Sequence, residues 1–126
     1  MLPKKNRLRS KRDFDRVFKN SRPFSAGNLA FRLAENRLRD ERGRGIVRFG
    51  FIISNKVEKL ATRRNGLRRQ LSAIAKDLIL TLKPGYDVVV VVRQNFQYPY
   101  NQIEIRKSLV SALQKAGLLP DAKDNH

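Results

Sequence analysis

The sequence has no cysteine and no tryptophan, and its single histidine, His126, is the last of the 126 residues. A chain without cysteine forms no disulfide and offers no thiolate to a metal ion. A chain without an internal histidine cannot assemble a Ser-His-Asp set. The sequence therefore predicts a protein without a nucleophilic active site of its own.

Acidic residues are scarce as well, with 11 Asp and Glu against 28 Lys and Arg. The close acidic pairs are Asp13/Asp15, Asp40/Glu41 and Asp121/Asp124. Asp13 and Asp15 point apart on an expected helix, and Asp40 and Glu41 lie in an expected loop. Neither pair resembles the carboxylate cluster of a two-metal nuclease, and no "GKS" or "GKT" phosphate loop occurs. We predict that the chain binds its partner without breaking bonds and holds no metal or cofactor itself.

Cations dominate the composition, and the formal net charge is +17. A compact domain with this charge repels itself, and a polyanionic partner relieves the repulsion. Nucleic acid is the first candidate for that partner and an anionic membrane surface is the second. The longest apolar run, Val88 to Val92, is too short to cross a bilayer. No apolar stretch follows the basic segment 1–12, so we expect a cytoplasmic protein without a signal peptide.

The length and a hydrophobic fraction of 40% predict one folded α+β domain. Ser10 followed by Asp13 is an N-cap pattern, and the apolar periodicity predicts the remaining elements. The expected elements are a helix over 11–19, a short strand at 22–25, strands over 28–35, 46–54 and 86–93, and helices from Thr62 to before "KPG" and over 102–115. Residues 1–10 are expected to form a mobile basic arm, and residues 118–126 a loose tail.

The strands over 28–35 and 46–54 predict an antiparallel hairpin with a long tip. Gly50 indicates a bulge or a close approach of another group to the backbone. The valine run predicts a strand buried on both faces, as beside a parallel neighbour. The helix after Thr62 joins the strands over 46–54 and 86–93 as a βαβ unit, for which a right-handed crossover is the usual outcome.

The helix after Thr62 has the most unusual charge. Four arginines fall within seven residues, namely Arg63, Arg64, Arg68 and Arg69. With Thr62 as N-cap, Arg63 and Arg64 would lie in the first turn, where each cation is unfavourable by about 0.3–1 kcal/mol. This arrangement favours a bound phosphate over a solvated face. Gly66 indicates a close approach of a partner's backbone or mere drift, because glycine inside a helix costs about 1 kcal/mol.

Phe14 and Phe18 lie one helical turn apart beside the basic arm. Such a pair can stack on unpaired bases. For Phe14, simple docking of its helix on the sheet is an equally good interpretation, whereas Phe18 is the stronger candidate for a base contact. Phe31, on the neighbouring strand, is a further candidate for the same groove.

Four segments of the chain resemble the small basic protein subunit of bacterial ribonuclease P. "NRLRSKRDFDRVFKN" is similar to the family's N-terminal helix, "GFIISNK" to its Ser-x-Lys strand end, "RRNGLRR" to its Arg-Asn-Arg helix and "KPGYDVVVVVR" to its last strand. The resemblance implies an α+β domain of order α-β-β-β-α-β-α, with a four-stranded mixed sheet and a left-handed βαβ crossover. It also implies an RNA-binding subunit of a tRNA-processing endonuclease whose catalyst is an RNA.

The resemblance and the outward helix face together assign roles to particular residues. Contacts to the RNA subunit are expected from Arg63, Arg64, Asn65, Arg68, Arg69, Ser72 and Lys76. Contacts to the single-stranded 5′ leader of precursor tRNA are expected from Phe14, Phe18, Phe31, Ser54 and Lys56. Accessory contacts are expected from the arm residues Lys4, Lys5, Arg7, Arg9, Lys11 and Arg12. Gly66 and Ser72 stand where the family usually has basic residues, the loop 55–62 is one residue longer, and Arg63 is a candidate substitute.

The resemblance implies the ribonuclease P RNA subunit and the precursor tRNA leader as partners, without a membrane partner. The protein is expected to be monomeric in the holoenzyme, and magnesium is expected to serve the RNA rather than this chain. A structural RNA-binding protein, such as a ribosomal protein, is one alternative, and a stand-alone nuclease is another. Stimulation of precursor tRNA processing by the ribonuclease P RNA at low magnesium would favour the family assignment over a structural RNA-binding protein. Lack of cleavage by the isolated chain would exclude a stand-alone nuclease.

Overall fold

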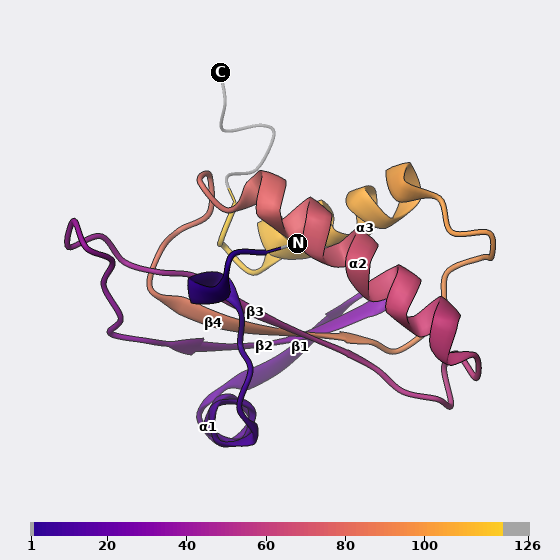
Figure 1. Cartoon of the computed structure of the whole chain (residues 1–126), viewed down its shortest axis with the longest axis horizontal. Coiled ribbons are helices and arrows are strands. Elements are labelled where there is room, and N and C mark those ends of the chain that lie inside the picture. Colours follow the sequence, from indigo (N-terminus) through magenta and orange to yellow (C-terminus); the bar gives the residue numbers. More distant parts are fainter. Residues whose placement is uncertain (1, 120–126) are drawn as a thin grey trace.

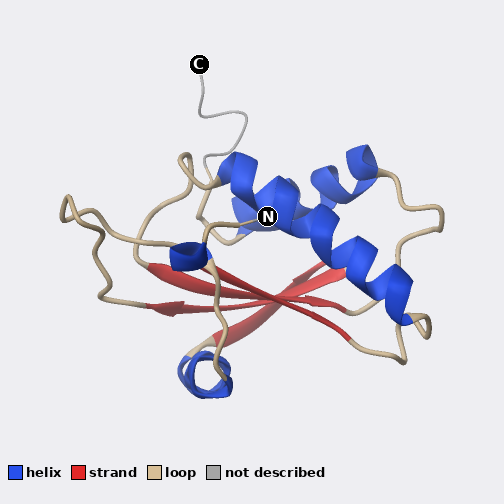
Figure 2. Cartoon of the chain, viewed as in Figure 1, coloured by secondary structure: helices blue, strands red, loops and turns tan. Residues whose placement is uncertain are grey.

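A computed structural model of the chain describes residues 2–119 (Figure 1). Its elements are η1 (Lys4–Asn6), α1 (Lys11–Asn20), β1 (Arg22–Ala26), β2 (Leu29–Glu35), β3 (Arg48–Ile53), α2 (Ala61–Leu78), β4 (Tyr86–Val92) and α3 (Gln102–Lys115). The α-β-β-β-α-β-α order and the four-stranded mixed sheet predicted from the sequence are confirmed. Helices α2 and α3 cover one face of the sheet, and α1 lies on the other (Figure 2). No helix within residues 2–119 is long and apolar enough to span a membrane.

The strand order is β1-β2-β4-β3, so the predicted hairpin between β2 and β3 is wrong. Strand β4 lies between them, antiparallel to β2 and parallel to β3. The reason is the composition of β4, whose Val88, Val89 and Val90 are completely buried. A strand without a polar face is stable only in the centre of a covered sheet, and it therefore separates its two more polar neighbours. The hand of the β3–α2–β4 crossover stays a prediction of the family resemblance.

The hairpin that does form joins β1 to β2 through the two-residue turn Gly27–Asn28. Gly27 has a φ of 60°, and no non-glycine residue of the described chain has a positive φ. A positive φ at the first central residue alone is the pattern of a type II′ turn, whose twist suits two antiparallel strands. The short strand at 22–25, predicted as an addition to the sheet, is thereby confirmed as β1.

The core consists of two apolar layers on either side of the sheet. The larger layer packs alternate residues of the strands against α2 and α3, and it includes the predicted stripe of α3 at Ile105, Leu109, Ala112 and Leu113. The smaller layer lies under α1 and contains Leu8, Val17, Ala34 and Val89. Leu118 and Leu119 are also buried in the larger layer, so the loose tail cannot begin at 118 as predicted. Residues 120–126 lie outside the described part of the chain.

The N-terminal segment was predicted to be a mobile arm, and this is wrong for residues 2–10. Leu2 and Leu8 are buried, and the Leu8 amide donates a 2.8 Å hydrogen bond to the carbonyl of Phe49 in β3. Asn6 donates from Nδ2 to the carbonyl of Val47 at 2.8 Å. The apolar residues between the lysines and arginines provide this anchoring. The segment therefore lies fixed along the outer edge of β3.

A buried carboxylate, Asp87 of β4, holds α1 on the sheet. Its oxygens accept hydrogen bonds from Arg16 of α1, from Asn36 at 2.9 Å, and from Arg48 of β3 at 2.9 and 2.7 Å. Arg48 also donates to Asp13 of α1 at 3.2 Å. The hydrogen bond to Asp87 raises the pKa of Arg48 above its ordinary value. Two residues of α1 are thus tied to the two parallel strands through one carboxylate.

Replacing Asp87 with Asn should lower the free energy of unfolding by about 3–5 kcal/mol, because two arginines would lose their partner in a buried site. Urea unfolding monitored by circular dichroism measures the loss. The control is Asp77→Asn, which breaks an exposed 2.7 Å pair with Arg106 and should cost less than about 1 kcal/mol. Equal losses in the two variants would contradict the role given to Asp87.

Candidate nucleic-acid interface

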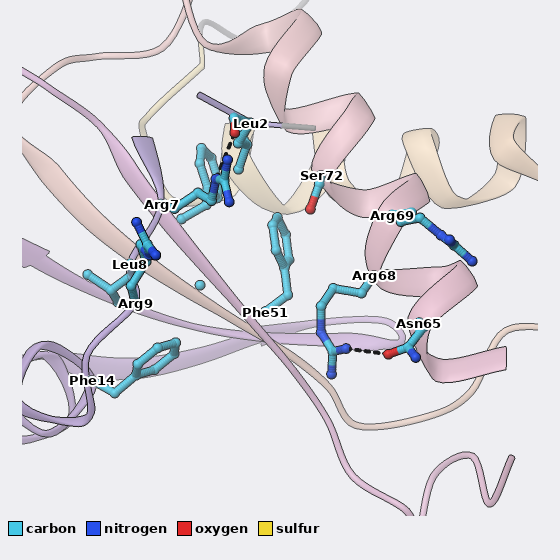
Figure 3. Close-up of a pocket in the computed structure, with 12 residues that line it drawn as sticks. Leu2, Arg7, Leu8, Arg9, Phe14, Phe51, Asn65, Arg68, Arg69 and Ser72 are labelled. Carbon is cyan, nitrogen blue, oxygen red and sulfur yellow. Dashed lines mark hydrogen bonds between the residues drawn. The ribbon is translucent and has the colours of Figure 1, made fainter. Parts of the chain in front are cut away.

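A cleft of about 470 Å³ opens between the N-terminal segment, the edge strand β3 and helix α2 (Figure 3). The lining residues are Leu2, Arg7, Leu8, Arg9, Phe14, Phe49, Gly50, Phe51, Asn65, Arg68, Arg69 and Ser72. The volume lies in the range of pockets that hold small organic ligands. The cleft therefore has room for an unpaired base, with apolar groups at its floor and cations along both sides.

The floor depends on Gly50. A Cβ at this position would lie 2.6 Å from Cε1 of Phe14, so the Phe14 ring occupies the space that a side chain would take. Gly50 pairs regularly with Val89 in the β3–β4 ladder, which excludes the bulge and confirms the close approach. Phe51, the next residue of β3, is half-buried on the opposite, α2 side of the sheet and stacks on Phe49, so the cleft reaches around the edge of β3. Of the three aromatic lining residues Phe49 is buried, so Phe14 on one side of β3 and Phe51 on the other are the accessible rings.

One wall of the cleft is the polar face of α2, with Asn65, Arg68, Arg69 and Ser72. The Arg68 guanidinium donates to Oδ1 of Asn65 at 2.9 Å, which fixes the direction of the side chain. Arg69 is exposed and forms no hydrogen bond or ion pair within residues 2–119. Lys76 is exposed two turns further along α2, outside the cleft lining.

Helix α2 begins at Ala61 with Leu60 as N-cap, so Thr62 is not the N-cap as predicted. Arg63 and Arg64 therefore occupy the third and fourth positions of the helix, still in its first turn, rather than the first two. Arg64 donates to the carbonyls of Glu58 and Lys59 at 2.7 and 2.9 Å. The Arg64 guanidinium, which the sequence predicts as a phosphate contact, thus already has hydrogen-bond partners within the chain.

Arg63 also has partners within the chain. Its guanidinium carbon lies 3.7 Å from the centre of the Tyr98 ring, and its Nη1 lies 3.9 Å from Oε1 of Glu58. The Tyr100 hydroxyl lies 3.1 Å from the same Glu58 oxygen, and burial raises the pKa of Tyr100. The carboxylate of Glu58 offsets part of the positive charge at the start of α2, which is why both arginines are tolerated there.

The predicted leader-binding residues do not all meet in the cleft. Phe14 lines it, whereas Phe18 lies outside the lining with the Arg32 guanidinium 5.0 Å from its ring centre. Phe31 is fully buried on the α2/α3 side of the sheet and stacks on Phe24, so the prediction that Phe31 touches a ligand is wrong. Ser54 and Lys56 are exposed in the turn after β3, outside the lining.

The six predicted arm residues separate into three groups. Arg7 and Arg9 line the cleft opposite α2. Lys4 and Lys5 line a neighbouring hollow on the other side of residues 7 and 9. Lys11 and Arg12 are exposed on α1 and belong to neither lining.

Leu8 and Phe51 line the cleft, although the sequence alone does not single them out. Leu8 falls in the segment expected to be a mobile arm, and Phe51 falls in an expected strand with no sign of its exposure. The edge position of β3 decides both cases, because residues beside an open edge can face a cleft. The basic run is interrupted by Leu2 and Leu8, and these apolar residues indicate that the N-terminal segment packs on the rest of the domain.

The residues described in 2–119 contain no group of three or more His, Cys, Asp or Glu side chains that could hold a metal ion. The buried carboxylate Asp87 is surrounded by Arg16, Arg48 and Asn36, which are donors and not metal ligands. The side chains of this part of the chain thus do not fit a metal site.

The comparisons with known proteins agree with one another. A model of the family described as Ribonuclease P matches residues 2–117. The ribonuclease P protein component of Pseudanabaena sp. (strain PCC 6903) is 34% identical over 119 residues, which cover 94% of this chain and 97% of that protein. The corresponding component of Synechocystis sp. is 38% identical over 91 residues, covering 72% and 69%.

Two solved structures have the same fold. The RNase P protein from Thermotoga maritima superposes with a TM-score of 0.73 at 26% identity, covering 86% of this chain and 98% of that one. The RNase P protein of Staphylococcus aureus superposes with a TM-score of 0.75 at 21% identity, covering 90% and 97%. These structures support the predicted fold class.

Gly50, which lines the cleft, and Gly66 of α2, which does not, should respond oppositely to alanine. Gly50→Ala should lower the free energy of unfolding by about 1–3 kcal/mol, because the new methyl group forces Phe14 away from β3. Gly66→Ala should raise it by up to about 1 kcal/mol, because no atom lies within 4 Å of a Cβ there.

Denaturant unfolding measures the free energy of unfolding of both variants. A Gly50→Ala protein as stable as the wild type would show that the position of Phe14 does not require a glycine at residue 50. RNA affinity tests the remaining hypothesis about Gly66. Weaker RNA binding by the stabilised Gly66→Ala protein would support a close backbone approach at this position. Stronger binding by Gly66→Arg would instead indicate drift from the family pattern.

Proposed function

The chain belongs to the ribonuclease P protein family, and from that membership we propose that α2 binds the RNA subunit while the cleft holds the 5′ leader of precursor tRNA. The family supplies the protein component of a tRNA-processing endoribonuclease whose partner is the ribonuclease P RNA subunit. Which residues touch which RNA belongs to the proposal. A role in tRNA processing also supports the cytoplasmic location predicted from the sequence.

The observation that carries the leader assignment is the composition of the cleft. Phe14 covers Gly50 on one side of β3 and Phe51 lies on the other side, while Arg7, Arg9 and the arginines of α2 flank the cleft. Unpaired RNA presents stacking faces and a charged backbone, and stacking platforms beside cations are how proteins hold single strands. A double-stranded segment has no free base to offer these rings. The cleft therefore suits a single strand better than a duplex.

The observation that supports an RNA-subunit contact is the exposed side of α2. Arg69 and Lys76 are exposed there without ion pairs within residues 2–119, and Leu60 supplies no side-chain oxygen to cap the first-turn amides. Free amides at a helix start attract phosphate, and exposed cations add to that attraction. Arg68 and Arg69 also line the cleft, so both lie where this surface meets it. Helix α2 would thus hold the RNA subunit on one side and face the leader on the other.

Cleavage itself is assigned to the RNA subunit in this proposal. The described side chains fit no metal site, so magnesium would be bound by RNA, and this chain would act by positioning both RNAs. The protein would add cations along the strand that the RNA subunit must hold. That contribution should matter most when magnesium is too dilute to screen RNA–RNA repulsion.

Reconstitution with a bacterial ribonuclease P RNA tests the proposal at low magnesium. The wild-type protein should restore 5′ processing of precursor tRNA, whereas the chain alone should cleave nothing. Arg68→Ala/Arg69→Ala should weaken binding of the RNA subunit and make the slope of log affinity against log salt shallower by about 1.4–1.8 units, about 0.7–0.9 per lost phosphate contact.

The matched control for that variant is Lys107→Ala/Lys115→Ala, which removes two exposed charges from α3. Its salt slope should stay close to that of the wild-type protein. An unchanged slope in the α2 variant, or equal changes in both variants, would reject α2 as the contact surface. Failure of the wild-type protein to stimulate processing would reject the function as a whole.

The leader assignment predicts a selective effect at Phe14. Phe14→Leu keeps an apolar group over Gly50 but removes the aromatic face, and stacking contributes about 1–3 kcal/mol per base. Holoenzyme affinity for precursor tRNA should fall about fivefold or more, whereas affinity for mature tRNA should not change. Equilibrium binding to both tRNA forms measures the difference.

Phe18→Ala is the comparison, since Phe18 lies on the same helix but outside the cleft. It should change neither affinity, which reverses the order of importance expected from the sequence. If Phe18→Ala reduced precursor affinity more than Phe14→Leu at equal protein stability, the leader would have to bind on the outer side of α1.

A further inference from the structure

A second hollow lies directly beside the cleft, between the N-terminal segment and the β2–β3 connection. We call it the basic groove; it has a volume of about 380 Å³, and its basic lining residues are Lys4, Lys5, Arg7, Arg9, Arg39 and Arg48. Asp13 is the only acid in the lining, and it already pairs with Arg48 at 3.2 Å. The groove is therefore a concentration of positive charge without a matching acid.

The cations of the groove are largely free. Within residues 2–119, neither lysine nor Arg9 or Arg39 forms an ion pair. Several like charges around one hollow repel one another, and the repulsion is relieved by an anion that bridges them. Because Leu2 and Leu8 anchor the arm, these charges are held together by the fold and do not simply drift apart.

The β2–β3 connection is also fixed in place. Its base closes through a bridge between Arg39 and Gly45, and Oδ1 of Asp40 accepts hydrogen bonds from the amides of Arg42 and Arg44 at 2.9 Å each. The backbone hydrogen bond from Arg44 holds the pKa of Asp40 below its ordinary value. Figure 1 shows this connection projecting from one end of the sheet. Arg39 is thus presented by an ordered turn.

The groove and the cleft share two residues. Arg7 and Arg9 line both, so a strand that leaves the cleft across them enters the basic groove without crossing another element. The chemistry changes along this path, because the cleft is bordered by Phe14 and Phe51 whereas no aromatic residue lines the groove. The first part can stack on bases, and the second can contact only phosphates.

From this continuity we propose that the basic groove binds the phosphates of the leader's distal nucleotides, with Lys4, Lys5 and Arg39 as the contacting side chains. The proposal rests on the leader assignment for the cleft and extends it. Recognition in the groove would be insensitive to sequence, because every nucleotide presents the same phosphate. It would depend strongly on salt and on leader length, since short leaders end before they reach the groove.

The test compares leader lengths in the reconstituted holoenzyme. The variant is Lys5→Gln/Arg39→Gln, and the matched control is Lys107→Gln/Lys115→Gln on α3. Substrates are mature tRNA and precursors with leaders of about 4 and about 12 nucleotides, which fall within the usual range of single-strand site sizes. With the longer leader, the groove variant should have a salt slope shallower by about 1.4 units, about 0.7 per lost contact. With the shorter leader it should match the wild-type protein.

A modified substrate provides an independent readout. Neutral methylphosphonate linkages in the distal half of the long leader should weaken binding to the wild-type holoenzyme. They should also remove the difference between the wild-type protein and the groove variant. This coupling would not appear if the two substitutions merely loosened the fold.

The remaining outcomes would overturn the proposal. An equal loss with the short leader or with mature tRNA would assign the groove to the RNA subunit or to the tRNA body. No loss with any substrate would leave the groove without an RNA role. Failure of the leader assignment itself is distinguishable, because the wild-type holoenzyme would then bind precursor and mature tRNA equally.

Discussion

The buried carboxylate of Asp87 is the interaction on which the arrangement of the surface depends. It lies in the central strand and joins Arg16 of α1 to Arg48 of β3. Apart from that connection, α1 is held against the sheet by a small apolar layer and by hydrogen bonds to β2, from Arg16 to the Glu35 carbonyl and from Arg32 to the Phe18 carbonyl. Phe14 also lies on α1, so the position of its ring over Gly50 depends on this buried charge on the same face of the sheet. An acid in an otherwise basic chain thus determines where an aromatic ring can meet a ligand.

The parts of the fold that were predictable from the sequence are those in which neighbouring residues decide the structure. Ser10 caps α1 by accepting from the Asp13 amide, and Asn101 caps α3, whose bounds follow its apolar spacing. The valines of β4 indicated burial on both faces. The predicted β2–β3 hairpin failed because adjacency in sequence does not reveal that a more apolar strand will take the place between two others.

The candidate site was less predictable, because its residues come from segments that meet only after folding. The arginines of α2 were apparent from their spacing, but the partners of Arg63 and Arg64 are Tyr98 and loop carbonyls that no local pattern indicates. The sequence favoured Phe18 over Phe14 as a base contact, yet Phe14 is the one that faces Gly50 and lines the cleft. Phe31 looked like their neighbour, but strand alternation places it on the opposite face of the sheet.

The docking of residues 7 and 8 on β3 has a consequence for the behaviour of the free protein. β3 is the last strand of the sheet and pairs with β4 alone, so its outer rim would present unpaired backbone groups. Open rims of this kind are templates for association between copies of a chain. The bridge between Arg7 and Phe49 covers part of that rim with backbone from the same molecule, and the surrounding lysines and arginines repel another copy. The N-terminal segment, which contributes to the nucleic-acid surface, therefore also limits association between copies through the edge of β3.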